Sequence, residues 1–184
     1  RAVRSEYDRA AMALVEKFHA DMILLAGYVW ATTDIVLDNY LVVNVHPADL
    51  AVTDENGHRP LAGANGIKSA FDRKMDYLRA SAHLATKELD AGPLLVRSPK
   101  VPVDYTLHED YETRFRYYLK LVNDQNRLAG ARAVLELALG NFSVDDENHL
   151  YYKGEPAPQG LTIESWEENK PSFQHDHDKL LNPK

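Results

Sequence analysis

Two polar side chains stand at the end of a run that otherwise has the composition of a buried strand. The run is LVVNVHP at residues 41–47, and its polar members are Asn44 and His46. Side chains alternate across a strand, so both point to the face opposite Val43 and Val45. An amide and an imidazole there can each donate a hydrogen bond to an oxygen that gains negative charge in a reaction. A structural interpretation stays open, in which the asparagine caps a turn and backbone groups satisfy the histidine.

A second pair of polar residues lies in the segment AHLATKELDAGP. Here His83 falls on a predicted strand and Asp90 in the turn that follows it. A carboxylate held by an imidazole can orient a nucleophile and shuttle its proton. Asp-Ala-Gly-Pro is also an ordinary turn sequence, in which Asp90 would serve the turn alone.

The surrounding elements alternate between helix and strand. Apolar residues spaced three and four apart predict helices, and short apolar runs predict buried strands. The run at 21–27 predicts a strand that is buried on both of its faces. This alternation predicts an α/β fold with a parallel sheet, which places Asn44 and His46 at the carboxyl ends of strands, where such sheets bind ligands. The expected helices cover 5–20, 32–40, 64–78 and 107–139, the last being one helix or two that stop at Gly140. Strands are expected at 21–27 and 41–45, and two more within 80–103 are joined by the turn 88–92. A hairpin is expected over 142–156.

The first helix carries a more detailed expectation. Its apolar spacing puts one set of side chains on a single face, and Ser5 is a candidate cap. The predicted buried face consists of Tyr7, Ala10, Ala11, Leu14, Val15 and Phe18.

Composition narrows the classes of function. The 184 residues carry a net charge of −7 without any lysine or arginine run, which argues against nucleic acid or anionic membrane as a partner. There is no cysteine, which excludes disulfides and thiolate sites. The longest uncharged apolar run, at 22–33, is shorter than the roughly 20 residues that span a bilayer. We therefore expect a cytoplasmic protein that acts on small molecules.

Four segments taken in order resemble one family. They are NVHPADL, GANGIKSAF, SAHLATKELDAGPLLVRSPKVPV and HLYYKGEPAPQGLTI. Together they are similar to the formyltransferases that use 10-formyltetrahydrofolate, above all the glycinamide ribonucleotide enzymes. The resemblance implies a Rossmann-like parallel sheet that lacks its first strands in this chain and ends in a hairpin. It covers a domain over 1–164, followed by a polar tail over 165–184.

The resemblance also implies a mechanism without a metal. An amine attacks the formyl carbon of 10-formyltetrahydrofolate, Asn44 and His46 stabilise the oxyanion, Asp90 takes or relays the proton, and His83 positions Asp90. The folate would lie against two segments, represented by Val29, Trp30, Ala31, Thr86 and Leu89.

Several departures from the family keep other interpretations open. Trp30 stands where those enzymes usually have arginine, and it either stacks on the folate or is a core or rim aromatic. Gln125 or Asn126 falls near the position of an acceptor-binding glutamate, so the acceptor need not be glycinamide ribonucleotide. The deformylase reaction, with water in place of the amine, is one alternative. A non-catalytic folate-binding subunit is another. For any of these functions, the partner expected is an N-terminal segment or a second chain that completes the sheet, or a second copy in a homo-oligomer.

Overall fold

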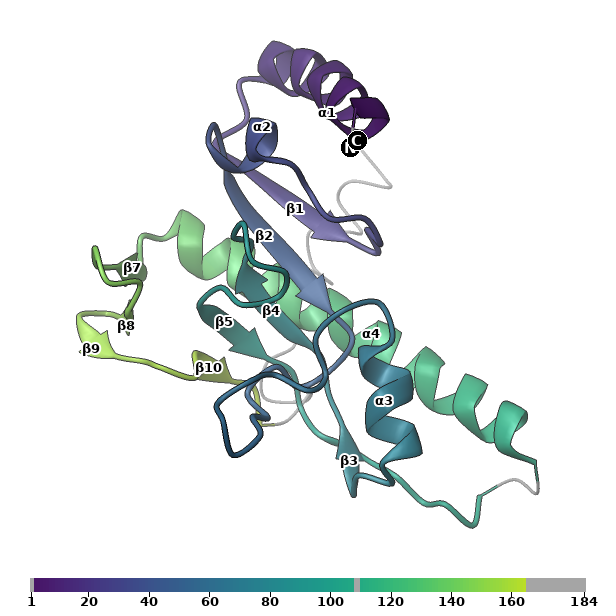
Figure 1. Ribbon diagram of the computed structural model, residues 1–184. Coiled ribbons are helices and arrows are strands. Elements are labelled where there is room, and N and C mark those ends of the chain that lie inside the picture. The colour runs from purple at the N-terminus through teal and green to yellow at the C-terminus, as the bar shows by residue number, and fades with distance from the viewer. Residues whose placement is uncertain (1, 108–109, 165–184) are drawn as a thin grey trace, which may run out of the picture.

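A central five-stranded sheet organises the structure, a computed structural model that describes residues 2–107 and 110–164 (Figure 1). The strand order is β1-β2-β4-β5-β10, and two small antiparallel sheets flank it. The tail predicted over 165–184 lies outside the described residues. The elements are α1 (Ala2–Val15), the 3-10 helix η1 (Glu16–Phe18), β1 (Met22–Ala26), α2 (Asp34–Leu37), β2 (Leu41–His46), α3 (Gly66–Asp72), β3 (Tyr77–Leu78), β4 (Ser81–Leu84), β5 (Leu94–Arg97), β6 (Val101–Pro102), α4 (Tyr111–Ala138), β7 (Phe142–Val144), β8 (Leu150–Tyr152), β9 (Glu155–Pro156) and β10 (Leu161–Thr162).

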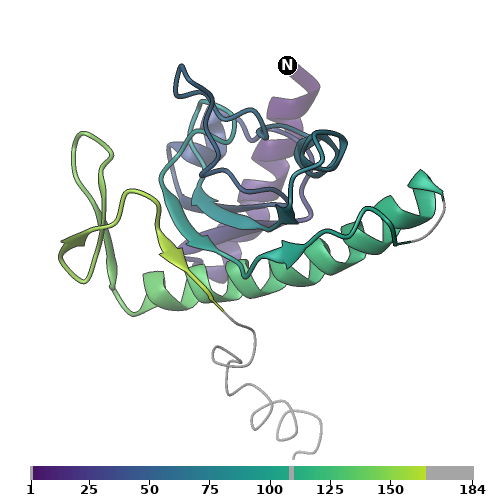
Figure 2. The same ribbon diagram turned by 90° about the horizontal axis from the view of Figure 1, so that it is seen from below.

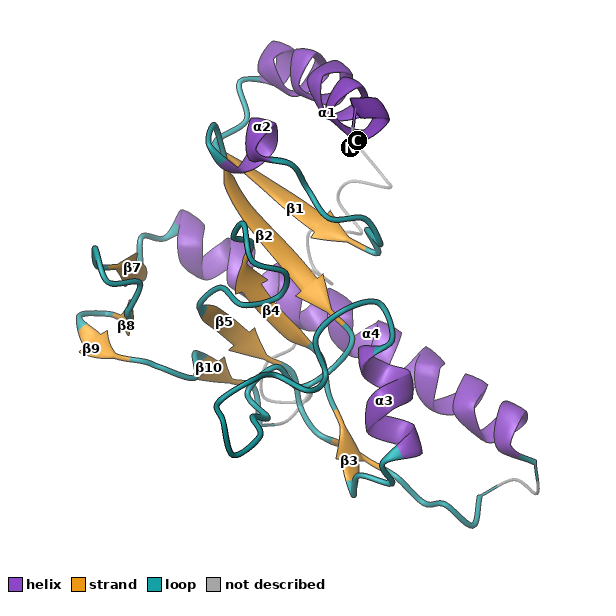
Figure 3. Cartoon of the chain, in the orientation of Figure 1, coloured by secondary structure: helices purple, strands orange, loops and turns teal. Residues whose placement is uncertain are grey.

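The central sheet is mixed, so the prediction of a parallel sheet was wrong in part. β1 and β2 are parallel, as are β5 and β10, but β4 runs antiparallel to both of its neighbours. After β2 the chain passes through a long loop, α3 and β3, and it re-enters the sheet at the end that it left (Figure 3). Hydrophobic periodicity reports which residues are buried and carries no information on strand direction, which explains the error.

One long helix covers the face of the sheet opposite Asn44 and His46. α4 is a single helix of 28 residues and crosses beneath the sheet (Figure 2). Asp110 caps its first turn by accepting a hydrogen bond from the N–H of Thr113 at 2.8 Å, and Gly140, at a φ of 68°, follows its end as predicted. The main core lies between α4 and the sheet and contains Val43, Val45, Ala82, Leu95, Val96, Leu128, Ala129 and Ala133.

Helix α1 buries a different face from the predicted one. Its buried residues are Asp8 and Met12, whereas Tyr7, Leu14 and Phe18 are exposed. The predicted cap, Ser5, lies inside the helix, which begins before it. The reason is a polar anchor that apolar spacing cannot reveal: the carboxylate of Asp8 accepts the backbone N–H of Thr33 at 2.9 Å and pairs with Arg4 at 3.1 Å.

Two further elements differ from expectation. Strand β1 is not buried on both faces: it forms one edge of the sheet, and Leu24 is 41% exposed. Helix α3 is shorter than 64–78, because Lys74 adopts a φ of 52° soon after Asp72. The following residues form β3, which pairs with β6.

The C-terminal hairpin was predicted correctly. β7, β8 and β9 form an antiparallel sheet whose first turn runs from Asp145 to Asn148. A buried carboxylate, Glu136 on α4, fastens this sheet to the helix. It accepts hydrogen bonds from Asn141 at 2.6 Å and Tyr152 at 3.1 Å and pairs with Arg132 at 2.6 Å. Within the described parts of the chain, no helix is both long and apolar enough to cross a membrane.

Candidate active site

Strands β2 and β4 bring three of the four predicted catalytic residues together. Asn44 and His83 are paired directly across the two strands, and their side chains meet at 3.1 Å between Asn44 Nδ2 and His83 Nε2. His46 follows on the same face of β2. Because β4 runs antiparallel to β2, this pairing needs no crossover helix, and it fixes the distance between the amide and the imidazole.

The fourth residue, Asp90, enters from the β4–β5 turn. It has a φ of 53°, a left-handed conformation that asparagine and aspartate tolerate better than most residues. Its Oδ1 lies 3.3 Å from both Asn44 Nδ2 and His83 Nε2. Its Oδ2 lies 3.4 Å from His46 Nδ1. The structure therefore gathers Asn44, His46, His83 and Asp90 into one group, which we call the Asp90 cluster.

Backbone groups of the 47–63 loop complete the cluster. The N–H of Gly63 donates to Asp90 Oδ2 at 2.7 Å, and the carbonyl of Leu61 lies 2.7 Å from His46 Nε2. Arg59 donates from one guanidinium nitrogen to the carbonyls of Asp90, at 2.7 Å, and Gly92, at 3.0 Å. No pattern in the sequence predicts a role for Gly63, Leu61 or Arg59. Gly63 has a φ of 84°, which glycine adopts readily, but a glycine in a loop does not by itself indicate a site.

Asp90 is held as a carboxylate. Burial acts to raise its pKa, but the hydrogen bond from His83, the charge that His46 carries in acid solution and the Gly63 N–H outweigh it and lower the pKa to about 2. Asp90 is 6% exposed. A buried carboxylate that is fully ionised at neutral pH is a strong hydrogen-bond acceptor aimed at its neighbours.

His46 is neutral at neutral pH. Burial lowers its pKa below the usual 6.5, although the nearby Asp90 carboxylate and the Leu61 carbonyl act in the opposite direction. Since a carbonyl can only accept, Nε2 carries the hydrogen and donates it to Leu61. An incoming oxygen must therefore take the place of the Leu61 carbonyl to receive that hydrogen bond.

The orientation of His83 follows from the same argument. Its Nδ1 lies 2.8 Å from the carbonyl of Leu84, so Nδ1 carries a hydrogen. In the neutral imidazole Nε2 then accepts from Asn44, and in the protonated form it donates to Asp90. His83 is 1% exposed, and its Nε2 lies 3.3 Å from Asp90 Oδ1; that it positions Asp90 stays a prediction.

The five predicted folate residues lie on two exposed segments. Val29 and Trp30 follow β1 and are 77% and 69% exposed, so the interpretation of Trp30 as a core aromatic is wrong. Ala31 is also exposed, and so are Thr86 and Leu89 in the β4–β5 turn. The Thr86 hydroxyl serves the turn itself, donating to the carbonyl of Glu88 at 2.9 Å. Contact between these residues and folate stays a prediction.

Two further predictions concern polar groups elsewhere. Gln125 and Asn126 are half-buried on α4, and the side-chain oxygen of each is buried without a hydrogen-bond partner among the described residues. Across the same residues no group of three or more histidine, aspartate or glutamate side chains is arranged to hold a metal ion. The segment QHDHD at 174–178 lies outside them.

Comparison with known proteins decides the family. The model of the family described as formyl transferase matches residues 1–118, which is more than half of the chain. The chain belongs to the formyl transferase family. Curated members of this family that are similar to the chain differ in the reaction they are named for. A formyltetrahydrofolate deformylase of Synechocystis is 32% identical over 89 residues, 48% of this chain and 28% of that protein. The phosphoribosylglycinamide formyltransferase of Escherichia coli is 26% identical over 102 residues, 54% of this chain and 44% of that protein.

Solved structures of family members share the fold. A phosphoribosylglycinamide formyltransferase from Coxiella burnetii has a TM-score of 0.67 at 19% identity, covering 87% of this chain and 69% of that one. A formyltetrahydrofolate deformylase from Pseudomonas syringae has a TM-score of 0.65 at 23% identity, covering 78% and 44%. The chain thus has the α/β fold of formyl transferase structures, and it spans between 28% and 44% of the length of the curated relatives.

Proposed function

We propose that this protein transfers the formyl group of 10-formyltetrahydrofolate to an amine. The observation that carries the proposal is the Asp90 cluster, in which one buried carboxylate contacts an amide and two imidazoles within 3.4 Å. Side chains of these types can stabilise an oxyanion and move a proton at the same place, and formyl transfer requires both. Membership of the formyl transferase family supports the choice of formyl donor.

Asn44 and His46 supply the hydrogen bonds to the oxyanion. The amine nitrogen attacks the formyl carbon, and the carbonyl oxygen takes up the negative charge of the tetrahedral intermediate. Asn44 Nδ2 and His46 Nε2 are held on one face of β2, which orients them before the reaction. Hydrogen bonds of this kind contribute about 3–4 kcal/mol each to transition-state stabilisation.

Asp90 relays the proton between the two nitrogens. The attacking amine must lose a proton, and the folate nitrogen must gain one as its bond to the formyl carbon breaks. With a pKa of about 2, Asp90 does not keep a proton at neutral pH. It therefore acts best as the acceptor that orients the amine or a bridging water and passes the proton on.

The exposed aromatic side chain of Trp30 is available for the folate. At 69% exposure it has a free ring face, and a flat pterin or benzoyl group offers a partner for stacking. Val29 and Leu89 are also exposed large apolar side chains. Covering them with a bound folate would remove apolar surface from water, which favours binding.

The acceptor amine is expected to differ from that of enzymes with a glutamate on this helix. Gln125 and Asn126 offer buried carbonyl oxygens without partners among the described residues. An amide oxygen accepts a hydrogen bond from a neutral amine or amide N–H, but it holds an ammonium group less strongly than a carboxylate does. This favours an acceptor bound through neutral N–H groups over glycinamide ribonucleotide.

Hydrolysis is the second candidate function, because the Synechocystis relative at 32% identity is named a deformylase. Asp90 can orient a water as readily as an amine. The two reactions share the oxyanion but differ in the product, which is free formate in one and a formylated amine in the other.

The decisive experiment follows the label of a ¹⁴C-formyl donor. The protein is incubated with labelled 10-formyltetrahydrofolate, with and without candidate amines, and the products are separated. Label that moves to an amine supports transfer, and amine-independent release of labelled formate supports hydrolysis. Label that stays on the folate under all conditions, while folate still binds, would instead indicate a non-catalytic folate-binding subunit.

The outer edge of β1 is where a predicted protein partner would add a strand to the sheet. Among the described residues no strand pairs with its outer side, and Leu24 is partly exposed there. A strand added by an N-terminal segment, by another chain or by a second copy would pair with these backbone groups. Size-exclusion chromatography with light scattering separates a monomer from an assembly.

A further inference from the structure

A pocket lies between the 47–63 loop, the β4–β5 turn and the C-terminal hairpin. Its volume of about 340 Å³ is at the lower end of the roughly 300–1,000 Å³ typical of small-molecule sites. None of the four members of the Asp90 cluster lines it, but Arg59 and Ala91 border both this pocket and the turn that carries Asp90. The lining residues are Arg59, Ala91, Pro93, Asn148, His149, Leu150, Tyr151, Pro156 and Pro158.

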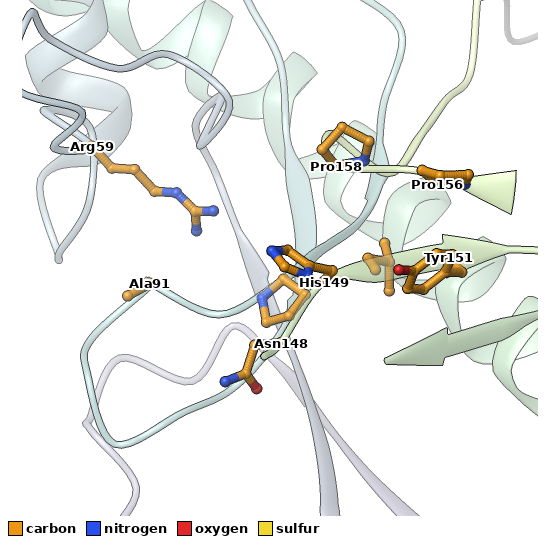
Figure 4. Close-up of a pocket in the computed structure, with 9 residues that line it drawn as sticks. Arg59, Ala91, Asn148, His149, Tyr151, Pro156 and Pro158 are labelled. Atoms are coloured by element: carbon orange, nitrogen blue, oxygen red, sulfur yellow. The ribbon is translucent and has the colours of Figure 1, made fainter. Parts of the chain in front are cut away.

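Arg59 gives the pocket its charge. Figure 4 shows its guanidinium pointing from the loop toward His149 on the hairpin. Burial is the main effect on Arg59 and lowers its pKa, while Asp90 and Glu88 raise it from a distance. Within residues 2–107 and 110–164 no carboxylate lies within 4.0 Å of this guanidinium, and its hydrogen bonds to the Asp90 and Gly92 carbonyls both leave from one nitrogen, Nη1. A partly desolvated cation without a contacting anion favours an anionic ligand.

The remaining walls favour a flat apolar group. Pro93, Pro156 and Pro158 present rigid ring faces, and Leu150 and Tyr151 add apolar surface. The imidazole of His149 uses Nδ1 toward Asp145 Oδ2 at 3.1 Å, which leaves Nε2 available to a ligand. Rigid walls lose little conformational entropy when a ligand binds.

We propose that this pocket binds a small aromatic carboxylate, with the ring against the prolines and the carboxylate on Arg59. Arg59 links this pocket to the candidate active site through its hydrogen bonds to the turn that carries Asp90. Arg59 holds the carbonyls of Asp90 and Gly92, so an anion that draws the guanidinium toward itself changes the turn that carries Asp90. The binding stands independently of the proposed function, and only the consequence for catalysis rests on it.

The test compares two probes that differ in charge but hardly in shape. 2-Naphthoate and 2-naphthamide are titrated into the ¹⁵N-labelled protein, and amide signals are followed by NMR. We expect naphthoate to bind at least tenfold more tightly than naphthamide and to shift Ala91, Asn148, His149 and Tyr151. Shifts at Asp90 and Gly92 should accompany them. Equal affinities, no binding, or naphthoate shifts confined to the segments around Trp30 and Thr86 would overturn the proposal.

Two variants assign the charge and the cavity separately. Arg59→Met keeps the length of the side chain, and we expect it to weaken naphthoate at least tenfold while leaving naphthamide unchanged. Arg116→Met is the matched control, since Arg116 is exposed on α4 and pairs with Glu112 at 2.8 Å. Ala91→Leu fills the pocket and should abolish the binding of both probes even if the arginine variant fails to fold. Full naphthoate binding in folded Arg59→Met or in Ala91→Leu would refute the assignment.

Discussion

Replacing Asp90 by asparagine removes one charge at the centre of the cluster and little else. The side chains are almost the same size, and asparagine tolerates the φ of 53° as well as aspartate does. The amide oxygen can still accept the Gly63 N–H, now 2.7 Å away. Its NH₂ group then faces Asn44 Nδ2, which is also a donor, so the contact at 3.3 Å is lost.

The cost to the fold follows from the pKa of Asp90. It falls from 3.8 to about 2 on folding, so the ionised carboxylate is stabilised by at most about 2 kcal/mol at neutral pH, where His46 no longer contributes its charge. This stabilisation is fully present above about pH 4 and is lost as the pH falls through 2. We expect Asp90→Asn to lower the free energy of unfolding at pH 7 by no more than this amount.

The cost to turnover should be larger. General acid–base catalysis contributes on the order of 10²–10⁴-fold, and an amide cannot accept the proton. We therefore expect kcat to fall by that factor, while the Kd of a non-reactive 10-formyl folate analogue changes little. The assay measures labelled formyl transfer under saturating donor, together with urea unfolding between pH 2 and pH 7.

Two results would refute this reasoning. Turnover within threefold of the wild type would remove Asp90 from the mechanism. An acid-dependent loss of stability between pH 4 and pH 2 that is the same in the variant and the wild type would mean that another carboxylate has the low pKa. Asp54→Asn is the control, because Asp54 is a more exposed aspartate whose pKa is also lowered, mainly by the His58 N–H.

Three further predictions concern the support of the site and of the hairpin. Gly66→Ala would place a methyl group against the Leu61 carbonyl and His46 Nε2, so turnover should fall at least tenfold. Gly57→Ala strains the same loop, because Gly57 has a φ of 79°, but its added methyl group meets open space, so it controls for loop strain without a clash at the cluster. Equal kinetics of the two variants would contradict a steric effect on His46. Glu136→Ala removes the carboxylate that Arg132, Asn141 and Tyr152 share, and it should lower the free energy of unfolding by about 3–5 kcal/mol. The control is Glu112→Ala at an exposed ion pair, which should lower it by less than about 0.5 kcal/mol. The pKa of His46 is lowered in the folded protein, so as the pH falls below 6.5 the unfolded chain takes up the proton first and the free energy of unfolding should decline. NMR titration of the imidazole and urea unfolding of His46→Gln measure this. A His46 pKa above 6.5 would contradict the prediction.

The sequence predicted the Asp90 cluster because each of its parts has a local signal. Asn44 and His46 interrupt an apolar strand with the two-residue period of a sheet, and Asp90 stands in a recognisable turn. Family resemblance then related segments that are far apart in the chain. The backbone donor of Gly63 and the acceptor of Leu61 have no side-chain signature, so only the folded loop reveals them.

The errors in the fold share a different cause. Apolar spacing identified β1 and α1 but could not show that β1 is an edge strand or that Asp8 turns the helix toward Thr33. Both depend on contacts between segments distant in sequence. Strand direction has the same dependence, which is why a parallel sheet was expected although β4 runs antiparallel to β2.

The direct pairing of Asn44 with His83 makes the chemistry sensitive to the alignment of two short strands. A register irregularity against β5 lies between Ala82 and His83, at the point where the imidazole is presented. A single inserted residue in β4 would put Ala82 or Leu84 opposite Asn44 and turn the imidazole to the far side of the sheet. Length variation among natural sequences should therefore be tolerated in the exposed part of the loop at 53–58 and in the hairpin turn, but be absent between Ser81 and Leu84.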